Sequence, residues 1–425
     1  MKVLGIIVEY NPMHNGHLYH LQKAKELIDP DYTIAVMSGN FCQRGEPAII
    51  NKFARARMAL KHGIDIVFEL PTIYAIQDAG GFAYGAIGVL HKTNTVTDIV
   101  FGSESADINF LEKVALLLHN QPEGFGQLLK KELKKGLSYP NARKYALKNF
   151  LTSSSDEIKK LEKSNDILGI EYIRAIFKYK SKIKYHVIKR IGSNYNDPAF
   201  KGKFSSATAI RRLIKEKKDI SQTLPEKNLK ILENEIANGR GPVFLEDLTC
   251  FVIPLFRKMR REDFEKIYGF NEGLDLRFFK YSRECGTLQS LIESIKAKRF
   301  TYSRIRRLIL MTMLNIEKEF AELSNKYGPQ YLRVLGFTKK GQVLLSKIKK
   351  RTFIPIITTV SLKEKVLQKV RNDMEKNKRN WDIVPELYTR QLELDILSSD
   401  IYTYFYKSED QRKSGMDFRK PIIEG

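Results

Sequence analysis

The sequence has few cysteines and lacks any long apolar run. Its 425 residues include three cysteines, which are widely spaced and form no CxxC pair: Cys42, Cys250 and Cys285. Such a set supports neither a disulfide framework nor a zinc ribbon, and it fits a reducing cytoplasm. The apolar run at 3–8 is much too short for a signal peptide or a membrane span. We therefore expect a cytoplasmic protein that does not associate with membranes.

Beyond the N-terminal quarter of the chain, acidic residues are too few to balance the basic ones. The net charge is +24, yet residues 1–110 carry nine Lys and Arg against eleven Asp and Glu, so the remaining 315 residues carry 64 against 38. A small-molecule enzyme has no need of such a positive field, whereas a polyanion such as RNA would be attracted and held by it. The alternative is that the charge reflects a Lys-rich proteome or serves solubility alone.

The chain does contain enough apolar material for folded domains. Hydrophobic residues make up 43% and aromatic residues 11% of the sequence, and the length allows two or three domains. Helix-type patterns at 49–62 and 79–91 separate short apolar runs that predict strands. These runs lie at 2–8, 33–37, 64–68, 97–101 and 184–188. Repeated strand–helix–strand order predicts an α/β fold with a doubly wound parallel sheet.

The predicted domains follow from where these patterns stop. A helical insertion interrupts the sheet at 106–180, and helical patterns dominate beyond residue 215, with one further strand signal at 355–360. We therefore divide the chain into a nucleotide-binding domain at 1–215 and a basic, mostly α-helical domain at 216–425.

The most informative segment is the junction between the first predicted strand and the first predicted helix. Residues 5–20 read GIIVEYNPMHNGHLYH, and three of the seven histidines lie within it, at His14, His17 and His20. Phosphate oxygens are favoured where a helix exposes its first N–H groups, and Gly16 would let a nucleotide approach the backbone. His14 and His17 lie three residues apart and can face one ligand. The alternative is that both histidines are ordinary polar residues of a first helical turn. A metal site is poorly supported, because no acidic residue completes a zinc site here.

Other predicted strand ends carry loops that suit the same nucleotide site. The glycine-punctuated loop at 38–47 contains a cation, the segment Gly102-Ser103-Glu104 follows the fourth strand, and 189–192 reads Lys-Arg-Ile-Gly. Hydroxyl caps Ser206 and Thr208, with Arg211 one turn later, mark a second helix start. Ligands bind at the carboxyl ends of strands in open α/β sheets, although each loop alone could be turn chemistry. The segment 336–341 has P-loop glycine spacing but lacks the following Lys-Ser/Thr.

The His14-Asn15-Gly16-His17 element, with the later Ser-Ser-x-Thr-x-x-Arg at 205–211, resembles the nucleotidyltransferase superfamily with its HUP-like fold. The whole pattern is closest to the bacterial tRNA(Met) cytidine acetate ligases. The resemblance covers nearly the full chain and is carried by GIIVEYNPMHNGHLYH, SGNFCQRGEPA (38–48), FGSE (101–104), SNDILG (164–169) and YLRVLGF (331–337).

The resemblance implies an ATP site and a set of residues that contact it. We expect His14 and His17 to be catalytic. The expected ATP contacts are Ile7, Val8, Glu9, Tyr10, Asn11, Pro12, Met13, His14, Asn15, Gly16, His17, Leu18, Tyr19, His20, Gly102, Asn165, Arg190, Ser206, Thr208 and Arg211. Mg²⁺ would accompany ATP, and no protein-held metal is expected.

The family's reaction would be acetylation of the wobble cytidine of elongator tRNA(Met). Acetate would attack the α-phosphate of ATP, release pyrophosphate and form acetyl-adenylate, from which cytidine N4 displaces AMP. The pentavalent phosphate gathers negative charge, which His14, His17 and the helix N–H groups would stabilise, and Arg190 or Arg211 would neutralise pyrophosphate.

The RNA contacts are predicted from basic segments in and after the insertion. Candidates are Lys130, Lys131, Lys134 and Lys135, for which a solvated helix face is an equal alternative, and the mixed basic and aromatic segment 298–307. In that segment Arg299 precedes Arg304 and Arg307, and the last two share a helix face. Single-stranded loops such as the anticodon are where bases can be read individually.

Three other functions remain open at this stage. A small-molecule adenylyltransferase would share the histidine element but would not need over two hundred basic helical residues. A noncatalytic RNA-binding protein would not need intact histidines. A class I aminoacyl-tRNA synthetase is favoured only by a faint signature at 203–206. The sequence leaves open the choice among short carboxylates, the residue that orients cytidine N4 and the oligomeric state.

Overall fold

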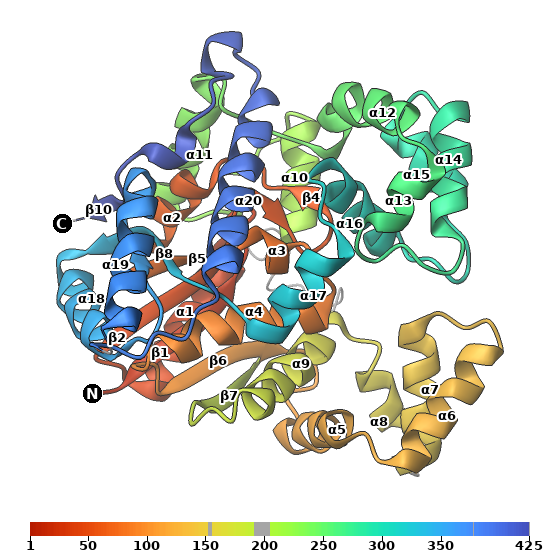
Figure 1. Cartoon of the computed structure of the whole chain (residues 1–425), viewed down its shortest axis with the longest axis horizontal. Helices are drawn as coiled ribbons and strands as arrows, with labels where there is room; N and C mark the ends of the chain where they lie inside the picture. The colour runs from red at the N-terminus through yellow and green to blue at the C-terminus, as the bar shows by residue number, and fades with distance from the viewer. Residues whose placement is uncertain (152–154, 191–204, 377, 425) are drawn as a thin grey trace.

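A twisted eight-stranded sheet forms the centre of the molecule (Figure 1). The computed structural model describes residues 1–151, 155–190, 205–376 and 378–424. The strand order is β10-β8-β5-β2-β1-β6-β7, and β9 pairs with β8 outside this path. The strands are β1 (Val3–Val8), β2 (Tyr32–Ser38), β5 (Ile66–Leu70), β6 (Asp98–Ser103), β7 (Lys184–Lys189), β8 (Leu332–Thr338), β9 (Ile356–Ile357) and β10 (Ile422–Glu424). The five strands expected from the N-terminal half are all present.

The apolar runs form strands because the sheet is covered on both faces. In β1, Leu4, Ile6 and Val8 enter one core, whereas Val3 enters the other. A parallel strand buried on both faces has no need for alternating polar residues. One core includes residues of α1 (Asn15–Ile28) and α2 (Lys52–Leu60), and the other includes residues of α3 (Thr72–Ala75), α4 (Ala79–Lys92) and α9 (Ser164–Lys178). The predicted doubly wound α/β fold is confirmed.

The sheet is mixed rather than wholly parallel, and the C-terminal half contributes to it. β8 runs antiparallel to β5, and β10 runs parallel to β8. No strand was predicted at 332–338, the segment that forms β8 and contains Arg333. Its guanidinium is buried against Asp417, whose carboxylate oxygen lies 3.4 Å away. Pairing lets the charge occupy an inner strand. The division at residue 215 stays a prediction.

Helices between β6 and β7 occupy the predicted insertion. The series is α5 (Ile108–Asn120), α6 (Glu123–Lys134), α7 (Tyr139–Leu151), α8 (Ser155–Lys160) and α9. α5 packs on α9, and α9 packs on α4 and β6, so these two helices belong to the layer that covers the sheet. In Figure 1, α6, α7 and α8 stand away from the sheet as a separate group.

A second helical group, which we call the basic lobe, consists of five helices. They are α12 (Thr249–Lys258), α13 (Arg261–Lys266), α14 (Leu274–Glu284), α15 (Leu288–Ile295) and α16 (Tyr302–Met313). Its interior is aromatic: the rings of Phe256, Phe264 and Phe278 lie in mutual contact, with centroids 5.5 to 6.1 Å apart. The lobe therefore has apolar packing of its own and presents α16 toward the rest of the molecule.

The remaining helices return to the sheet and its covering layer. They are α10 (Ala207–Lys215), α11 (Glu226–Ala237), α17 (Lys318–Tyr327), α18 (Lys339–Arg351), α19 (Lys363–Glu375) and α20 (Pro385–Tyr404). α11 packs on α2, and α20 packs on α3 and α17. A small hairpin of β3 (Phe41–Cys42) and β4 (Glu46–Pro47) follows β2, and β4 contacts α16. The hairpin thus joins the sheet edge to the basic lobe.

Candidate active site

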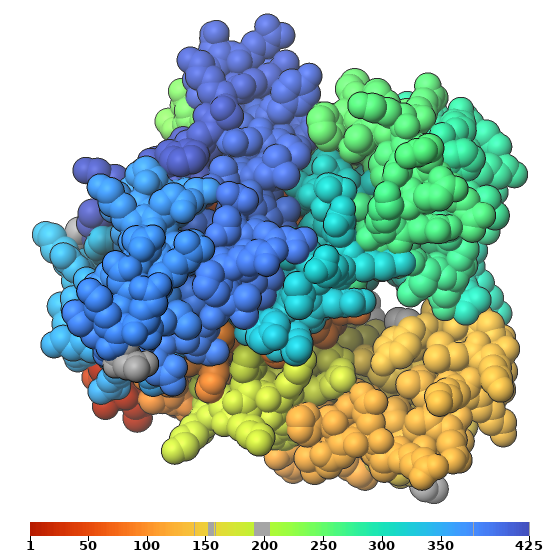
Figure 2. Space-filling model, viewed as in Figure 1, coloured from red at the N-terminus to blue at the C-terminus, as the bar shows by residue number. Residues whose placement is uncertain are grey.

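A large cavity lies between the carboxyl edge of the sheet and the two helical groups. Figure 2 shows the molecule hollowed between the basic lobe and the helices α5–α9. The cavity measures about 1480 Å³ and is lined from the ends of β1, β6 and β7 and from α1, α9 and α16. Sites for a single small ligand usually hold about 300–1,000 Å³. This cavity has room for a nucleotide and part of a second substrate.

Most of the residues predicted from the sequence line this cavity. They are Ile7, Val8, Glu9, Tyr10, His14, Gly16, His17, Tyr19, His20, Gly102, Asn165, Arg190, Ser206, Arg299, Arg304 and Arg307. The predicted residues outside the lining are Asn11, Pro12, Met13, Asn15, Leu18, Thr208, Arg211, Lys130 and Lys131. Ile191 and Gly192, which belong to a predicted strand-end loop, lie outside the described residues, as does Lys203-Phe204 of the synthetase-like signature.

His14 and His17 cap α1 with their side chains. His14 Nδ1 accepts a hydrogen bond from the N–H of Gly16 at 3.0 Å, and His17 Nδ1 accepts one from the N–H of His14 at 3.3 Å. The two rings stack with centroids 3.8 Å apart, and Tyr10 meets His17 edge-on at 5.1 Å. An imidazole that accepts at Nδ1 carries its proton on Nε2 when neutral. The pair therefore holds fixed orientations, with Nε2–H as the donor.

The first N–H groups of α1 are not free, contrary to our expectation. The N–H of Asn15 donates to the Thr223 carbonyl at 3.1 Å, that of Gly16 to His14, and that of His17 to the His14 carbonyl at 2.9 Å. A helix start whose amides are already paired has fewer donors for a phosphate. The imidazoles, rather than these amides, supply the donors at this end of the cavity.

Burial keeps all three histidines of this segment neutral at pH 7. It lowers the pKa of His14 and of His20 to about 4, and the charge of Arg190 adds to the effect. The pKa of His17 falls well below 6.5 because of burial, and next because of His14 and Arg190. His20 Nε2 is buried without a hydrogen-bond partner among the described residues. These rings are suited to donating N–H bonds to an anion without carrying charge themselves.

The second corner of the cavity brings together Gly102, Asn165 and Arg190. Arg190 Nη1 donates to Asn165 Oδ1 at 3.2 Å, and Asn165 Nδ2 donates to Glu104 Oε1 at 2.7 Å. A Cβ at Gly102 would lie 3.0 Å from Arg190 Cγ, so the missing side chain lets Arg190 pass close to β6. Since Arg190 also acts on the pKa of the three histidines, the corner is close to the start of α1.

The later Ser-Ser-x-Thr-x-x-Arg element is split between two roles. Ser206 lines the cavity and caps α10, with Oγ accepting from the Ala209 N–H at 3.2 Å. Arg211 points elsewhere: its guanidinium donates to the Asn11 carbonyl at 3.1 Å and to Glu46 at 2.8 Å. We infer that Arg211 holds the β1–α1 turn against the β3–β4 hairpin, which removes it as a partner for pyrophosphate.

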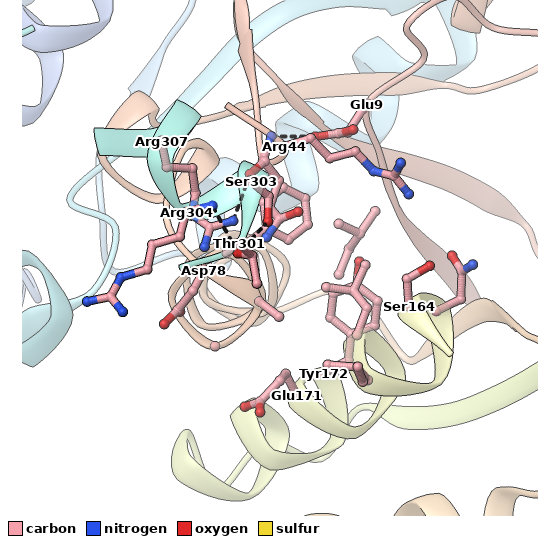
Figure 3. Close-up of a pocket in the computed structure, with 18 of the residues that line it drawn as sticks. Glu9, Arg44, Asp78, Ser164, Glu171, Tyr172, Thr301, Ser303, Arg304 and Arg307 are labelled. Carbon is pink, nitrogen blue, oxygen red and sulfur yellow. Dashed lines mark hydrogen bonds between the residues drawn. The ribbon is translucent and has the colours of Figure 1, made fainter. Parts of the chain in front are cut away.

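The hairpin loop also fixes Glu9 at the end of β1. Glu9 Oε1 accepts from the Gln43 N–H at 2.7 Å, and burial raises the pKa of this carboxyl group. Arg44, the next residue, lines the cavity and is exposed. In Figure 3 the side chains of Glu9 and Arg44 lie near each other at the same end of the cavity. The cation that the sequence placed in this loop is therefore available to an anionic ligand.

The wall opposite the sheet is formed by the predicted RNA contacts. Arg299 and Arg304 both pair with Glu272, each at 2.7 Å, and Arg307 Nη1 donates to the Gln43 carbonyl at 3.4 Å. Figure 3 shows Arg304 and Arg307 together with Thr301 and Ser303 on this wall. Lys130 and Lys131 are exposed on α6, outside the cavity lining.

Sequence reasoning missed several residues that line the cavity. Asp78 caps α4, Glu171 and Tyr172 lie on α9, and the segment 268–272 joins the basic lobe to the cavity. The one local signal was Asp78 before the Gly80-Gly81 pair, because Asp is a preferred N-cap. Nothing in the sequence brings α9 and 268–272 to the same space. Tertiary packing alone does so.

The comparisons with known proteins cover the whole chain. The family model described as HIGH Nucleotidyl Transferase matches residues 1–417. Curated proteins named tRNA(Met) cytidine acetate ligase are 63% identical over 423 residues in Thermosipho africanus and 61% identical over 426 residues in Fervidobacterium nodosum. Each alignment spans 100% of this chain and 99% of the relative.

A solved structure shows the same architecture. The crystal structure of Thermotoga maritima TmcAL bound with alpha-thio ATP is 52% identical, has a TM-score of 0.93, and is covered to 99% by an alignment spanning 100% of this chain. In the part of the chain that the structure describes, no helix is both long and apolar enough to cross a membrane. The fold, the histidine corner and these full-length matches together lead to one conclusion: the chain belongs to the tRNA(Met) cytidine acetate ligase family, within the HIGH nucleotidyltransferases.

Proposed function

We propose that this protein uses ATP to activate acetate and acetylates N4 of the wobble cytidine of elongator tRNA(Met). The observation that carries the proposal is the cavity itself, in which neutral His14 and His17 adjoin the Gly102–Asn165–Arg190 corner, with a basic wall opposite. Relatives that match the full chain bear the name of this activity.

The nucleotide end of the cavity suits the α-phosphate of ATP. Nε2–H of His14 and of His17 would donate to its oxygens as negative charge grows in the pentavalent state, and buried donors stabilise such charge strongly. Arg190 and Arg44 are two cations of the cavity lining that could pair with the phosphates. The buried Nε2 of His20, which has no partner among the described residues, fits a bound nucleotide as well.

Mg²⁺ would be held by the phosphates and water rather than by the protein. Among the described residues, no group of three His, Cys, Asp or Glu side chains could hold a metal ion. Mg²⁺ commonly keeps several waters and binds through substrate phosphates. When bound, it would neutralise charge on the leaving pyrophosphate.

The reaction would proceed in two displacements. Acetate is ionised at pH 7 and needs no base. Its carboxylate oxygen would bond to the α-phosphorus as the bond to the pyrophosphate oxygen breaks. Cytidine N4 would then bond to the acetyl carbon of acetyl-adenylate, and AMP would leave with the electron pair of the broken C–O bond. The cytidine would leave the anticodon stack to reach the cavity, with Arg299, Arg304 and Arg307 near its backbone.

The test follows both products. The protein is incubated with α-labelled ATP, Mg²⁺, acetate and total tRNA, labelled AMP is measured, and the digested tRNA is examined by nucleoside mass analysis. Acetate-dependent AMP together with N4-acetylcytidine supports the proposal. AMP attached to a small phosphorylated acceptor, with unmodified tRNA, would instead support the small-molecule adenylyltransferase alternative.

A further inference from the structure

We propose that Asp78 binds the exocyclic amine of the target cytidine and takes a proton from it during acetyl transfer. The inference rests on the proposed function and names a residue for its second step. Asp78 lies at the start of α4 and lines the cavity, and Figure 3 shows it on the side of the cavity away from Glu9 and Arg44.

Most carboxylates that line the cavity are already engaged. Glu9 accepts from the Gln43 N–H, and Glu104 accepts from Asn165. Glu171 pairs with Arg143 at 2.6 Å and with Arg174 at 3.1 Å. Glu272 pairs with Arg299 and Arg304. Among the described acidic side chains that line the cavity, Asp78 and Glu322 take part in none of these contacts.

Asp78 has one oxygen engaged and one free. Its Oδ1 accepts from the Gly81 N–H at 3.0 Å, which caps α4, and no described residue donates to its Oδ2. The side chain is exposed to the cavity. One carboxylate oxygen is therefore fixed by the helix, and the other can accept a hydrogen bond from a ligand.

Asp78 and Glu322 differ in how their carboxylates are held. A Cβ at Gly80 would lie 3.5 Å from both Asp78 Oδ1 and Glu171 Oε2, so Gly80 lets α4 approach α9 closely beside Asp78. Glu322 lies on α17 and is exposed, as Asp78 is. Of the two, Asp78 is the one whose carboxylate is oriented by a main-chain N–H.

Tyr172, on α9, supplies an independent sign of a ligand. Its side chain is 4% exposed, and its hydroxyl has no hydrogen-bond partner among the described residues. In Figure 3 it projects from α9 toward the cavity. Burial raises the pKa of Tyr172, and the charge of Glu9 adds to the effect, so the hydroxyl stays a donor. The hydroxyl is therefore a donor that a ligand in the cavity can use.

The donor and acceptor types match cytosine and not uracil. Cytosine presents an amine donor at N4 and acceptors at N3 and O2, and carboxylates are its usual N4 partners. Asp78 Oδ2 would accept from N4–H, while Tyr172 or Arg307 would donate to an acceptor of the ring. Arg307 is near Asp78: burial lowers the pKa of Arg307, and the negative charge of Asp78 acts in the opposite direction. Uracil would place O4 against the carboxylate and be repelled.

The same contact serves the chemistry of transfer. As N4 bonds to the acetyl carbon and the C–O bond to AMP breaks, N4 gains positive charge and loses one proton. Asp78 Oδ2 would accept that proton and return it to water. A general base in such a position commonly contributes about 10²–10⁴-fold in rate. Because Glu9 acts on Tyr172, the Tyr172 side of this subsite is the one nearer the end of β1, where the adenylate would form.

The test is Asp78→Asn, which keeps the cap because Asn caps helices as well as Asp does. Two reactions are measured on the full chain: acetate-dependent exchange of pyrophosphate into ATP, and N4-acetylcytidine formation in tRNA. The matched control is Asp107→Asn, since Asp107 caps α5 through the Phe110 N–H at 3.1 Å and lies outside the cavity.

We expect Asp78→Asn to keep exchange within about twofold and to lower acetylcytidine formation at least about 100-fold, while Asp107→Asn changes neither. Near-normal transfer in Asp78→Asn overturns the assignment, as does loss of transfer in Glu322→Gln instead. Equal loss of exchange and transfer would mean a structural role. Absence of acetate-dependent exchange in the unaltered protein would overturn the proposed function itself.

Discussion

The two walls of the cavity are built in opposite ways. The histidine wall comes from one continuous segment, 14–20, in which the buried ring of His14 and the half-buried ring of His17 are neutral and are held by main-chain hydrogen bonds. The basic wall comes from Arg299 and from Arg304 and Arg307 of α16, which are charged and tied to Glu272 or to the Gln43 carbonyl. One wall offers directed donors, and the other offers charge.

This difference separates chemistry from attraction. Neutral donors in a buried setting stabilise charge that develops during a reaction. Partly exposed arginines attract a polyanion and are screened by salt. We therefore expect substitutions on the histidine wall to change catalysis, and substitutions on the basic wall to change RNA binding.

The largest effect should come from the histidine wall. His17→Ala removes a donor at the start of α1, so acetate-dependent pyrophosphate exchange should fall about 10²–10³-fold. Binding of tRNA, measured by filter retention, should stay within about twofold because the basic wall is untouched. The control is His119→Ala, which alters an exposed histidine of α5. Parallel loss of exchange and binding would show that His17 is structural.

The basic wall should give a smaller effect of the opposite kind. Arg304→Ala with Arg307→Ala should weaken tRNA binding about tenfold and lower its salt slope by about 2, with exchange nearly unchanged. Glu272→Gln frees the partners Arg299 and Arg304, so it should strengthen binding. If neither variant alters binding, the RNA contacts lie elsewhere, and Lys130 and Lys131 become the next candidates.

Gly102→Ala tests how tightly the second corner is packed. The new Cβ would lie 3.0 Å from Arg190 Cγ and displace that side chain from Asn165. The KM for ATP should rise about fivefold, as for one lost hydrogen bond, with kcat little changed. Gly126→Ala is the matched control, because a Cβ there meets nothing within 4 Å. Equal KM values in the two variants would remove Arg190 from the ATP site.

The smallest effect should be that of pH on the histidine wall. Because the pKa of His14 is lowered from 6.5 to about 4, its ring stays neutral, and pyrophosphate exchange should vary less than about threefold between pH 8.0 and 5.5. A loss of activity near pH 6.5 would mean that the rings titrate normally. Stability should fall as pH drops from 6.5 toward 4, because the unfolded chain then binds more protons than the folded one.

Much of the N-terminal fold could be predicted because its strands are buried on both faces. Continuous apolar runs at β1, β2, β5, β6 and β7 are what such burial requires. β8 could not be predicted in this way, since Arg333 within it resembles a surface residue until Asp417 is placed beside it. The two are 84 residues apart in the sequence, and no local pattern links them.

The same distinction between local and long-range features applies to the candidate site. His14 and His17 could be found because their spacing, their strand-end position and the family motif lie in one short segment. The hydrogen bond from the Asn15 N–H to Thr223 and the pairing of Arg211 with Glu46 could not be found in this way. In each case the partner comes from a distant part of the chain.

The sequence by itself determined the α/β order of the first half, the histidine element and the positive charge of the rest, because each depends on neighbouring residues or on composition. Tertiary structure decided which cations face the cavity, which donors are already occupied, and that Asp78 and Tyr172 line the same cavity. Those features depend on contacts between residues far apart in the chain, and only packing brings such residues together.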